Sequence, residues 1–237
     1  MSKTAPRASE VLARFATASH AGPAVDVALQ TARTRLIAAL TALETPTATS
    51  ELASRALASY GTPLRRVFAE AVTLAATPEA RADAPIVAAA LAASALAGRG
   101  ETGAIEAIAI GREVGARLKR ALTLDAPWDT DAVVAGIAAA AAAARAAQLD
   151  PVSAQHAIGL AATQAAGLGT AEGTPGALLA CGKAAADAVE AALLARHGFT
   201  AASASLEGRR GLAALMGSNL DEAALLDDLG RRWFSAD

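Results

Sequence analysis

Residues 131–182 read DAVVAGIAAAAAAARAAQLDPVSAQHAIGLAATQAAGLGTAEGTPGALLACG. This pattern predicts two helices of small side chains, over 132–147 and 152–167, followed by a glycine-rich turn at 167–174. The helices are separated by Leu149-Asp150-Pro151, which has the form of a helix stop followed by proline in the first turn of the next helix. Because small side chains let backbones approach closely, we expect an antiparallel helix pair at the centre of an all-α domain.

The composition indicates a globular chain. It is 54% hydrophobic and 19% charged over 237 residues, which is sufficient for one helical domain spanning 1–237, with residues 1–8 expected to be disordered. A net charge of −2 gives no positive surface for nucleic acid or for an anionic membrane. As a helix the apolar stretch 132–147 would span only about 24 Å, so we expect it to be buried in protein and predict no membrane or nucleic-acid partner.

Cysteine usage bears on the compartment and on metal binding. Cys181 is the only cysteine, which excludes an intrachain disulfide and a cluster of thiolate metal ligands. The N-terminus also lacks the apolar stretch of an export signal. We therefore expect a cytoplasmic protein with no metal and no cofactor.

Capping residues and apolar periodicity predict further helices. They are expected at 9–19, 24–43, 49–60, 64–76, 85–97, 102–122 and 176–196, with short helices after 208 and at 221–229. Ser9 is the expected cap of the first helix, and no segment shows the alternation of a β-strand. Glu113 and Arg117, four residues apart, are predicted to form a helix-surface ion pair worth a few tenths of a kcal/mol.

Four segments in order resemble one known family. They read AIAIGREVGARL (107–118), GIAAAAAAARAAQLD (136–150) and HAIGLAATQAAGL (156–168), followed by 182–211, which includes HGFT and LEGRRG. In this order and spacing they resemble the helical domain of the MmgE/PrpD family, the group containing 2-methylcitrate dehydratase and cis-aconitate decarboxylase. The resemblance covers about 9–234. It implies a bundle of antiparallel helix pairs without the α/β second domain of the family, and a homodimer or a heteromer with a longer MmgE/PrpD-type subunit.

The resemblance also implies a reaction, in which a proton is moved next to a carboxylate of a di- or tricarboxylic acid without a metal. The family motif Asp-Phe-Asp-Asp-Thr-His falls on 73–78, where only Thr77 matches. The histidine of Gly-Phe-His-Pro-Thr falls on Asp129. The lysine and histidine that follow Glu-Gly-Thr fall on Ala177 and Ala180. Since acids, histidines and lysine are replaced together, we expect no catalytic residue of the family type.

Two functions remain open. The first is a non-catalytic scaffold or subunit, whose vestigial pocket would be lined by Thr77, Trp128, Asp129, Thr130, Thr174 and Lys183. The alternative is a small lyase or isomerase, of dehydratase or decarboxylase type, with a rewired or partner-completed site that could retain a small carboxylic acid. A helical ligand-binding regulator is a third alternative.

The other polar and aromatic residues have structural interpretations. His20 and His197 are expected to be exposed at helix ends, and His156 to be packed or partly exposed. Cys181 is expected to pack as a small apolar residue. Trp233 and Phe234 could either fasten the C-terminus to the core or form an interface.

Overall fold

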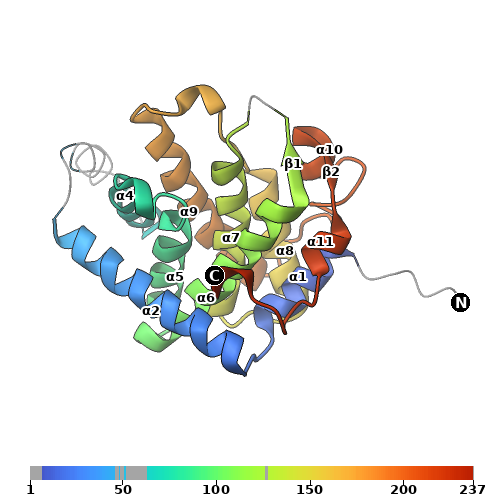
Figure 1. Ribbon diagram of the computed structural model, residues 1–237, viewed down its shortest axis with the longest axis horizontal. Helices are drawn as coiled ribbons and strands as arrows, with labels where there is room; N and C mark the ends of the chain where they lie inside the picture. Colours follow the sequence, from blue (N-terminus) through green and yellow to red (C-terminus); the bar gives the residue numbers. More distant parts are fainter. Residues whose placement is uncertain (1–6, 46–47, 49–50, 52–62, 126–127, 237) are drawn as a thin grey trace, which may run out of the picture.

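The computed structural model describes residues 7–45, 48, 51, 63–125 and 128–236 (Figure 1). The described chain is mainly helical, which confirms the predicted class. Its longer helices are α1 (Ala8–Thr17), α2 (Pro23–Glu44), α4 (Pro63–Ala75), α5 (Ala84–Leu96), α6 (Gly100–Ala121), α7 (Thr130–Ala146), α8 (Pro151–Thr163) and α9 (Gly176–Arg196). Its short elements are α10 (Leu212–Met216), α11 (Glu222–Leu226) and the 3-10 turns η1 (Pro78–Ala80), η2 (Gly169–Ala171) and η3 (Phe234–Ala236). Apart from residue 51, the predicted helix at 49–60 lies outside the described residues, as do residues 1–6 of the segment expected to be disordered.

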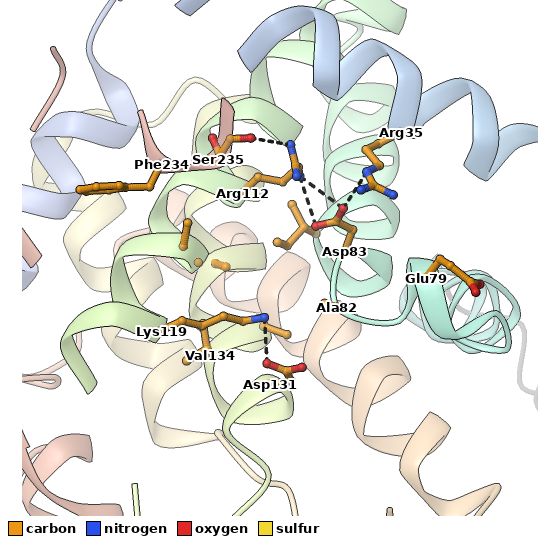
Figure 2. A pocket seen from close by; sticks show the side chains of 15 residues that line it. Arg35, Glu79, Ala82, Asp83, Arg112, Lys119, Asp131, Val134, Phe234 and Ser235 are labelled. Carbon is orange, nitrogen blue, oxygen red and sulfur yellow. Dashed lines mark hydrogen bonds and ion pairs between the residues drawn. The ribbon is translucent and has the colours of Figure 1, made fainter. Parts of the chain in front are cut away.

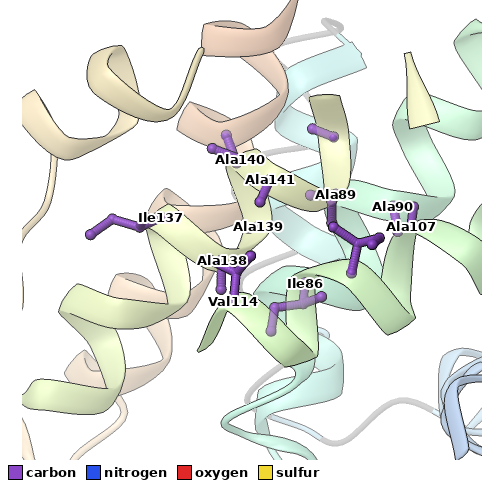
Figure 3. Close-up of a cluster of buried hydrophobic side chains, with 14 of the residues drawn as sticks. Ile86, Ala89, Ala90, Ala107, Val114, Ile137, Ala138, Ala139, Ala140 and Ala141 are labelled. Atoms are coloured by element: carbon purple, nitrogen blue, oxygen red, sulfur yellow. The ribbon is translucent and has the colours of Figure 1, made fainter. Parts of the chain in front are cut away.

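α7 runs through the middle of the molecule, with α5, α6, α8 and α9 packed around it. Its residues 132–144 are all buried, and alanines 138–144 expose no surface. Figure 3 shows the first four of these alanines, residues 138–141, among Ile86 of α5 and Val114 of α6. Short side chains allow α6 and α7 to cross closely, as the sequence predicts for this helix.

α8 follows α7 after a corner formed by residues 147–150. Asp150 caps α8, since its carboxylate accepts hydrogen bonds from the amides of Val152 and Ser153 at 2.9 and 3.2 Å. α8 ends at Thr163, four residues before the predicted end. It packs against α1, α7 and α9 but leaves Val152 63% exposed, so α7 is central while α8 lies at the surface.

The described residues contain a short two-stranded sheet, which the sequence did not predict. β1 (Leu122–Leu124) pairs antiparallel with β2 (Gly217–Leu220), and an isolated bridge joins Trp128 to Leu168. Strands of three and four residues are too short to show a clear alternation of apolar and polar side chains. Their pairing depends on segments nearly a hundred residues apart.

Ser9 does not cap α1, contrary to the prediction. α1 begins one residue earlier, at Ala8, and its N-cap Arg7 makes no side-chain capping bond. The Ser9 side chain is buried within the helix and donates a hydrogen bond to Glu207 Oε2 at 2.5 Å. Ser9 therefore joins α1 to the turn before α10.

Glu113 and Arg117 form a fully buried ion pair, so the prediction of an exposed pair is wrong. Arg117 Nε lies 2.7 Å from Glu113 Oε1, and both side chains are 0% exposed. Arg117 also donates to the carbonyls of Leu225, Asp227 and Arg232 at 3.1, 2.8 and 2.6 Å. The pair is buried because the C-terminal segment 222–236 lies over this face of α6 (Figure 1).

Both C-terminal aromatic residues fasten this segment to the core. Trp233 is buried, and its ring packs against Phe15 and His20 with centroids 5.4 Å apart in each case. Phe234 lies beneath the guanidinium groups of three arginines, including Arg117 at 4.9 Å from the ring centroid. These contacts bear out the first alternative for these residues, that they fasten the C-terminus to the core.

The prediction that His20 is exposed at a helix end is wrong. Its ring is half-buried between Phe15 and Trp233. Its Nε2–H donates to the Phe15 carbonyl at 2.8 Å. Burial lowers the pKa of His20 from 6.5, a shift that the hydrogen bond opposes and the nearby Arg145 charge reinforces.

We expect His20 to make the protein less stable in weak acid. Because its pKa is lower in the folded than in the unfolded state, the unfolded chain binds the proton more readily. The stability that neutral His20 contributes to the folded state is fully present above pH 6.5 and is lost as the pH falls towards the folded-state pKa. Urea unfolding at about pH 7.5 and about pH 5.5 should show a smaller loss of stability for His20→Gln than for the wild type, and equal losses would contradict the prediction.

Candidate functional site

Two loops meet at the start of α7, where the sequence places part of the candidate pocket. The amide of Asp129 donates to the carbonyl of Gly167 at 3.1 Å, next to the bridge between Trp128 and Leu168. Trp128, Asp129 and Thr130 are all partly exposed here. The structure thus brings together the loop before α7 and the loop after α8.

Asp129 uses its carboxylate to cap α7. Its Oδ1 accepts a hydrogen bond from the amide of Ala132 at 3.1 Å. Such a cap stabilises the helix by about 1 kcal/mol and satisfies an amide that has no partner inside the helix. The carboxylate therefore has a structural role at the N-terminus of the central helix.

The hydroxyls of the threonine candidates Thr77 and Thr174 bond to their own chain segments. Thr77 Oγ1 donates to the Leu74 carbonyl at 3.2 Å, and Thr174 Oγ1 donates to the Ala171 carbonyl at 2.6 Å. Both residues are exposed. They act as local turn and helix-end bonds.

Lys183 pairs with Asp187 one turn further along α9, at close hydrogen-bonding distance. It lines a hollow of about 30 Å³ with Gly136 and Gln164, whereas Thr77 lines a different groove beside Leu74 and Val87. The two residues therefore do not share one cavity.

A charged cavity of about 290 Å³ lies beside the start of α7 (Figure 2). At one end Asp83 pairs with Arg35 at 3.2 Å and with Arg112 at 3.3 Å. At the other end Lys119 pairs with Asp131 at 2.8 Å. Small residues of α6 and α7 line the space between these ends: Gly115, Ala116, Ala135 and Ala138.

Sequence reasoning missed this cavity. The spacing of Arg112, Gly115 and Lys119 places them on one face of α6, and this was the only signal available. Arg35 and Asp83 come from distant segments. With Glu79 at the rim, three basic side chains face three acidic ones, so the cavity presents no net charge to a ligand.

Comparison with known families identifies the chain. Residues 73–223 match the MmgE/PrpD N-terminal domain, which is more than half of the sequence. The chain belongs to the MmgE/PrpD family. No curated protein matches it significantly.

Of the positions aligned with the family's motifs, Ala177 and Ala180 on α9 carry apolar side chains in place of the lysine and the histidine. Ala177, in place of the family lysine, is buried in the first turn of α9. Ala180, in place of the histidine, lines the same small hollow as Lys183. Thr73, at the first motif position, is buried and donates to the Ala69 carbonyl within α4.

His156 takes part in a hydrogen bond that joins two segments of the fold. His156 is partly exposed, and its Nδ1 accepts a hydrogen bond from the Ala201 amide at 3.2 Å. Within the described part of the chain, no His, Cys, Asp and Glu side chains gather in threes as a metal site would need. Nor does any described helix combine the length and apolar character that crossing a bilayer requires.

We expect the thiol of Cys181 to be unreactive in the native protein. The side chain is 6% exposed, and burial raises its pKa to about 11. At neutral pH almost none of it is thiolate, the form that reacts. Labelling with a thiol-specific disulfide reagent should be slow in buffer and fast in urea; fast labelling in buffer would contradict the burial of this residue.

Proposed function

We propose that this chain is a non-catalytic member of its family that works as a homodimeric scaffold or subunit. The observation that carries the proposal is the local use of the candidate side chains. Asp129, Thr77, Thr174 and Lys183 each bond to a group within four residues. An acid or base is effective in catalysis when it can reach a substrate proton, and these groups are committed to their own helices and turns.

An apolar groove supports the interaction part of the proposal. It holds about 350 Å³ between α2, α4, α5 and α9, and among its lining residues are Leu43, Val67, Leu91 and Val189. Leu40 and Leu96 stand at its edge and are 46% and 52% exposed. Exposed apolar surface of this kind typically marks a contact with another protein.

The occupant we propose is a second copy of the chain. Ile37, 57% exposed, stands one turn before Leu40 on α2, so an apolar ridge lies beside the groove. A two-fold interface needs such a self-complementary surface, with each ridge entering the groove of the other copy. Arg66 and Glu70 line the same groove and pair with each other within the chain at 2.9 Å, so a two-fold contact would bring both signs of charge from each copy to the groove.

The test is the mass of the untagged protein in solution, measured by light scattering and native mass spectrometry. We expect a dimer, and we expect Leu40→Asp to weaken dimerisation at least about tenfold, because a carboxylate would be buried in an apolar contact. Leu215→Asp is the matched control, since Leu215 is 73% exposed and does not line the groove. A wild-type monomer, or equal effects of the two variants, would contradict the proposal.

Native mass spectrometry of protein from its own host also separates the other possibilities. If the protein is found in a complex with a longer MmgE/PrpD-type protein, the proposed homodimer is wrong and the chain is a subunit of a heteromer. Turnover of a di- or tricarboxylic acid that disappears in Asp129→Ala would instead favour the lyase or isomerase alternative over the non-catalytic proposal.

The single buried cysteine supports a cytoplasmic location as part of the same proposal.

A further inference from the structure

A second polar cavity, of about 370 Å³, lies at the opposite end of α7 from the loops described above. It is enclosed by the end of α1, the start of α6 and the end of α7. It is lined by Thr17, Ser19, Arg99, Glu106, Ala144, Arg145, Gln148 and Leu149. Since α7 is about 25 Å long, this cavity is separate from Asp129 and the loops at the start of α7.

The cavity has an excess of positive charge. Arg99 and Arg145 both pair with the same oxygen of one carboxylate, Glu106 Oε2, at 3.0 and 3.2 Å. Two guanidinium groups thus share one acid, which leaves a net charge of one. The arginine side chains are only 20% and 19% exposed, so water screens this charge poorly.

Donor groups here also lack acceptors. Arg145 donates through Nη1 to the carbonyls of Thr17 and Ala18, but its Nε is buried with no partner among the described residues. Ser19 and Gln148 are exposed, and among the described residues neither side chain has a hydrogen-bond partner. Since buried donors are normally satisfied, Arg145 Nε indicates a missing acceptor, and the exposed side chains of Ser19 and Gln148 line the same cavity and can donate to it.

Gln148 occupies a backbone position that favours glycine. Its φ is +55°, and it follows α7 in the turn in which its amide bonds to Arg145 O and the amide of Leu149 bonds to Ala144 O. Glycine is the usual residue here because it adopts this conformation without steric cost. The chain carries a hydrogen-bonding amide at the cavity instead.

We propose that this cavity binds a phosphate group. Its surplus positive charge calls for an anion, and its paired guanidinium groups suit an oxyanion. The donors come from three separate segments, namely the residues after α1, the residue before α6 and the end of α7, and this spread fits the tetrahedral oxygens of phosphate better than a planar carboxylate. The volume lies at the lower end of small-molecule sites, so a small phosphorylated compound fits as well as the free ion.

The test is calorimetric titration of the full chain with inorganic phosphate, glycerol phosphate and acetate at matched ionic strength. We expect both phosphates to bind more tightly than acetate. Tighter binding of glycerol phosphate would point to a phosphorylated compound, and tighter binding of inorganic phosphate to the free ion. No phosphate binding, or equal binding of acetate, would overturn the proposal.

Three variants connect the binding to this cavity. Glu106→Gln should bind phosphate about tenfold more tightly, because it removes the acid that competes for both arginines. Ser19→Ala and Gln148→Gly should each bind about threefold more weakly. Gln148→Gly should at the same time raise the melting temperature, which a purely structural role for Gln148 would not combine with weaker binding.

Asp228→Gly is the control for Gln148→Gly. Asp228 is the other described non-glycine residue with a positive φ, +44°, and it does not line this cavity. We expect it to raise the melting temperature and to leave phosphate affinity unchanged. Unchanged affinity in both Ser19→Ala and Gln148→Gly would overturn the assignment to this cavity.

Discussion

Arg117→Met is expected to lower the free energy of unfolding by about 3–5 kcal/mol, because it leaves the Glu113 carboxylate buried without its counter-ion. It also removes the donor from three carbonyls of the C-terminal segment. Urea unfolding measures the loss, and limited proteolysis should show cleavage within 222–236 before the rest of the chain is cut. A variant whose C-terminal segment stays protected would contradict the role assigned to Arg117.

Arg14→Met is the matched control for this prediction. Arg14 also pairs with a glutamate one helical turn away, at 2.6 Å from Glu10, but its side chain is 67% exposed. Exposed pairs of this kind contribute about 0.5 kcal/mol or less. If Arg117→Met costs no more than Arg14→Met, the buried ion pair does not hold the C-terminal segment.

The buried pair of Glu113 and Arg117 is a feature of the fold that the sequence could not predict. Helix positions follow from local signals, such as Asp150 before Pro151, and most helices were predicted within a few residues. The burial of Glu113 and Arg117 instead depends on a segment that follows them by more than a hundred residues. Spacing along α6 is the same for an exposed pair and for a buried one, so it cannot distinguish them.

The candidate site also has features that the sequence could predict and features that it could not. The meeting of Asp129 with Gly167 could be anticipated, because both lie in loops beside the predicted helix pair. The capping role of Asp129 could be recognised from its place before α7. The cavity of Arg35, Asp83 and Lys119 could not, since its members come from separate helices and their contacts arise only on packing.

Gly111→Ala is expected to destabilise the protein by about 1–3 kcal/mol through overpacking where α6 crosses α7. A Cβ at this position would lie 2.6 Å from Ile86 Cγ2, 2.9 Å from Ala142 Cβ and 3.0 Å from the Ala138 carbonyl oxygen. A carbonyl of α7 cannot move aside as a flexible side chain can. The two helices must therefore separate, which disturbs the alanine core drawn in Figure 3.

Gly136→Ala is the matched comparison for Gly111→Ala, and we expect it to stabilise the protein. Gly136 also lies inside a helix, but its nearest neighbour to an added Cβ is Ala184 Cβ at 3.7 Å, an ordinary van der Waals contact. Alanine costs less backbone entropy on folding than glycine, so this variant should gain about 0.5–1 kcal/mol. The sequence presents both glycines in similar apolar surroundings, and only the packing separates them. Urea midpoints that move in opposite directions are the expected result, whereas a stabilising Gly111→Ala would show that α6 and α7 are not packed as closely as described.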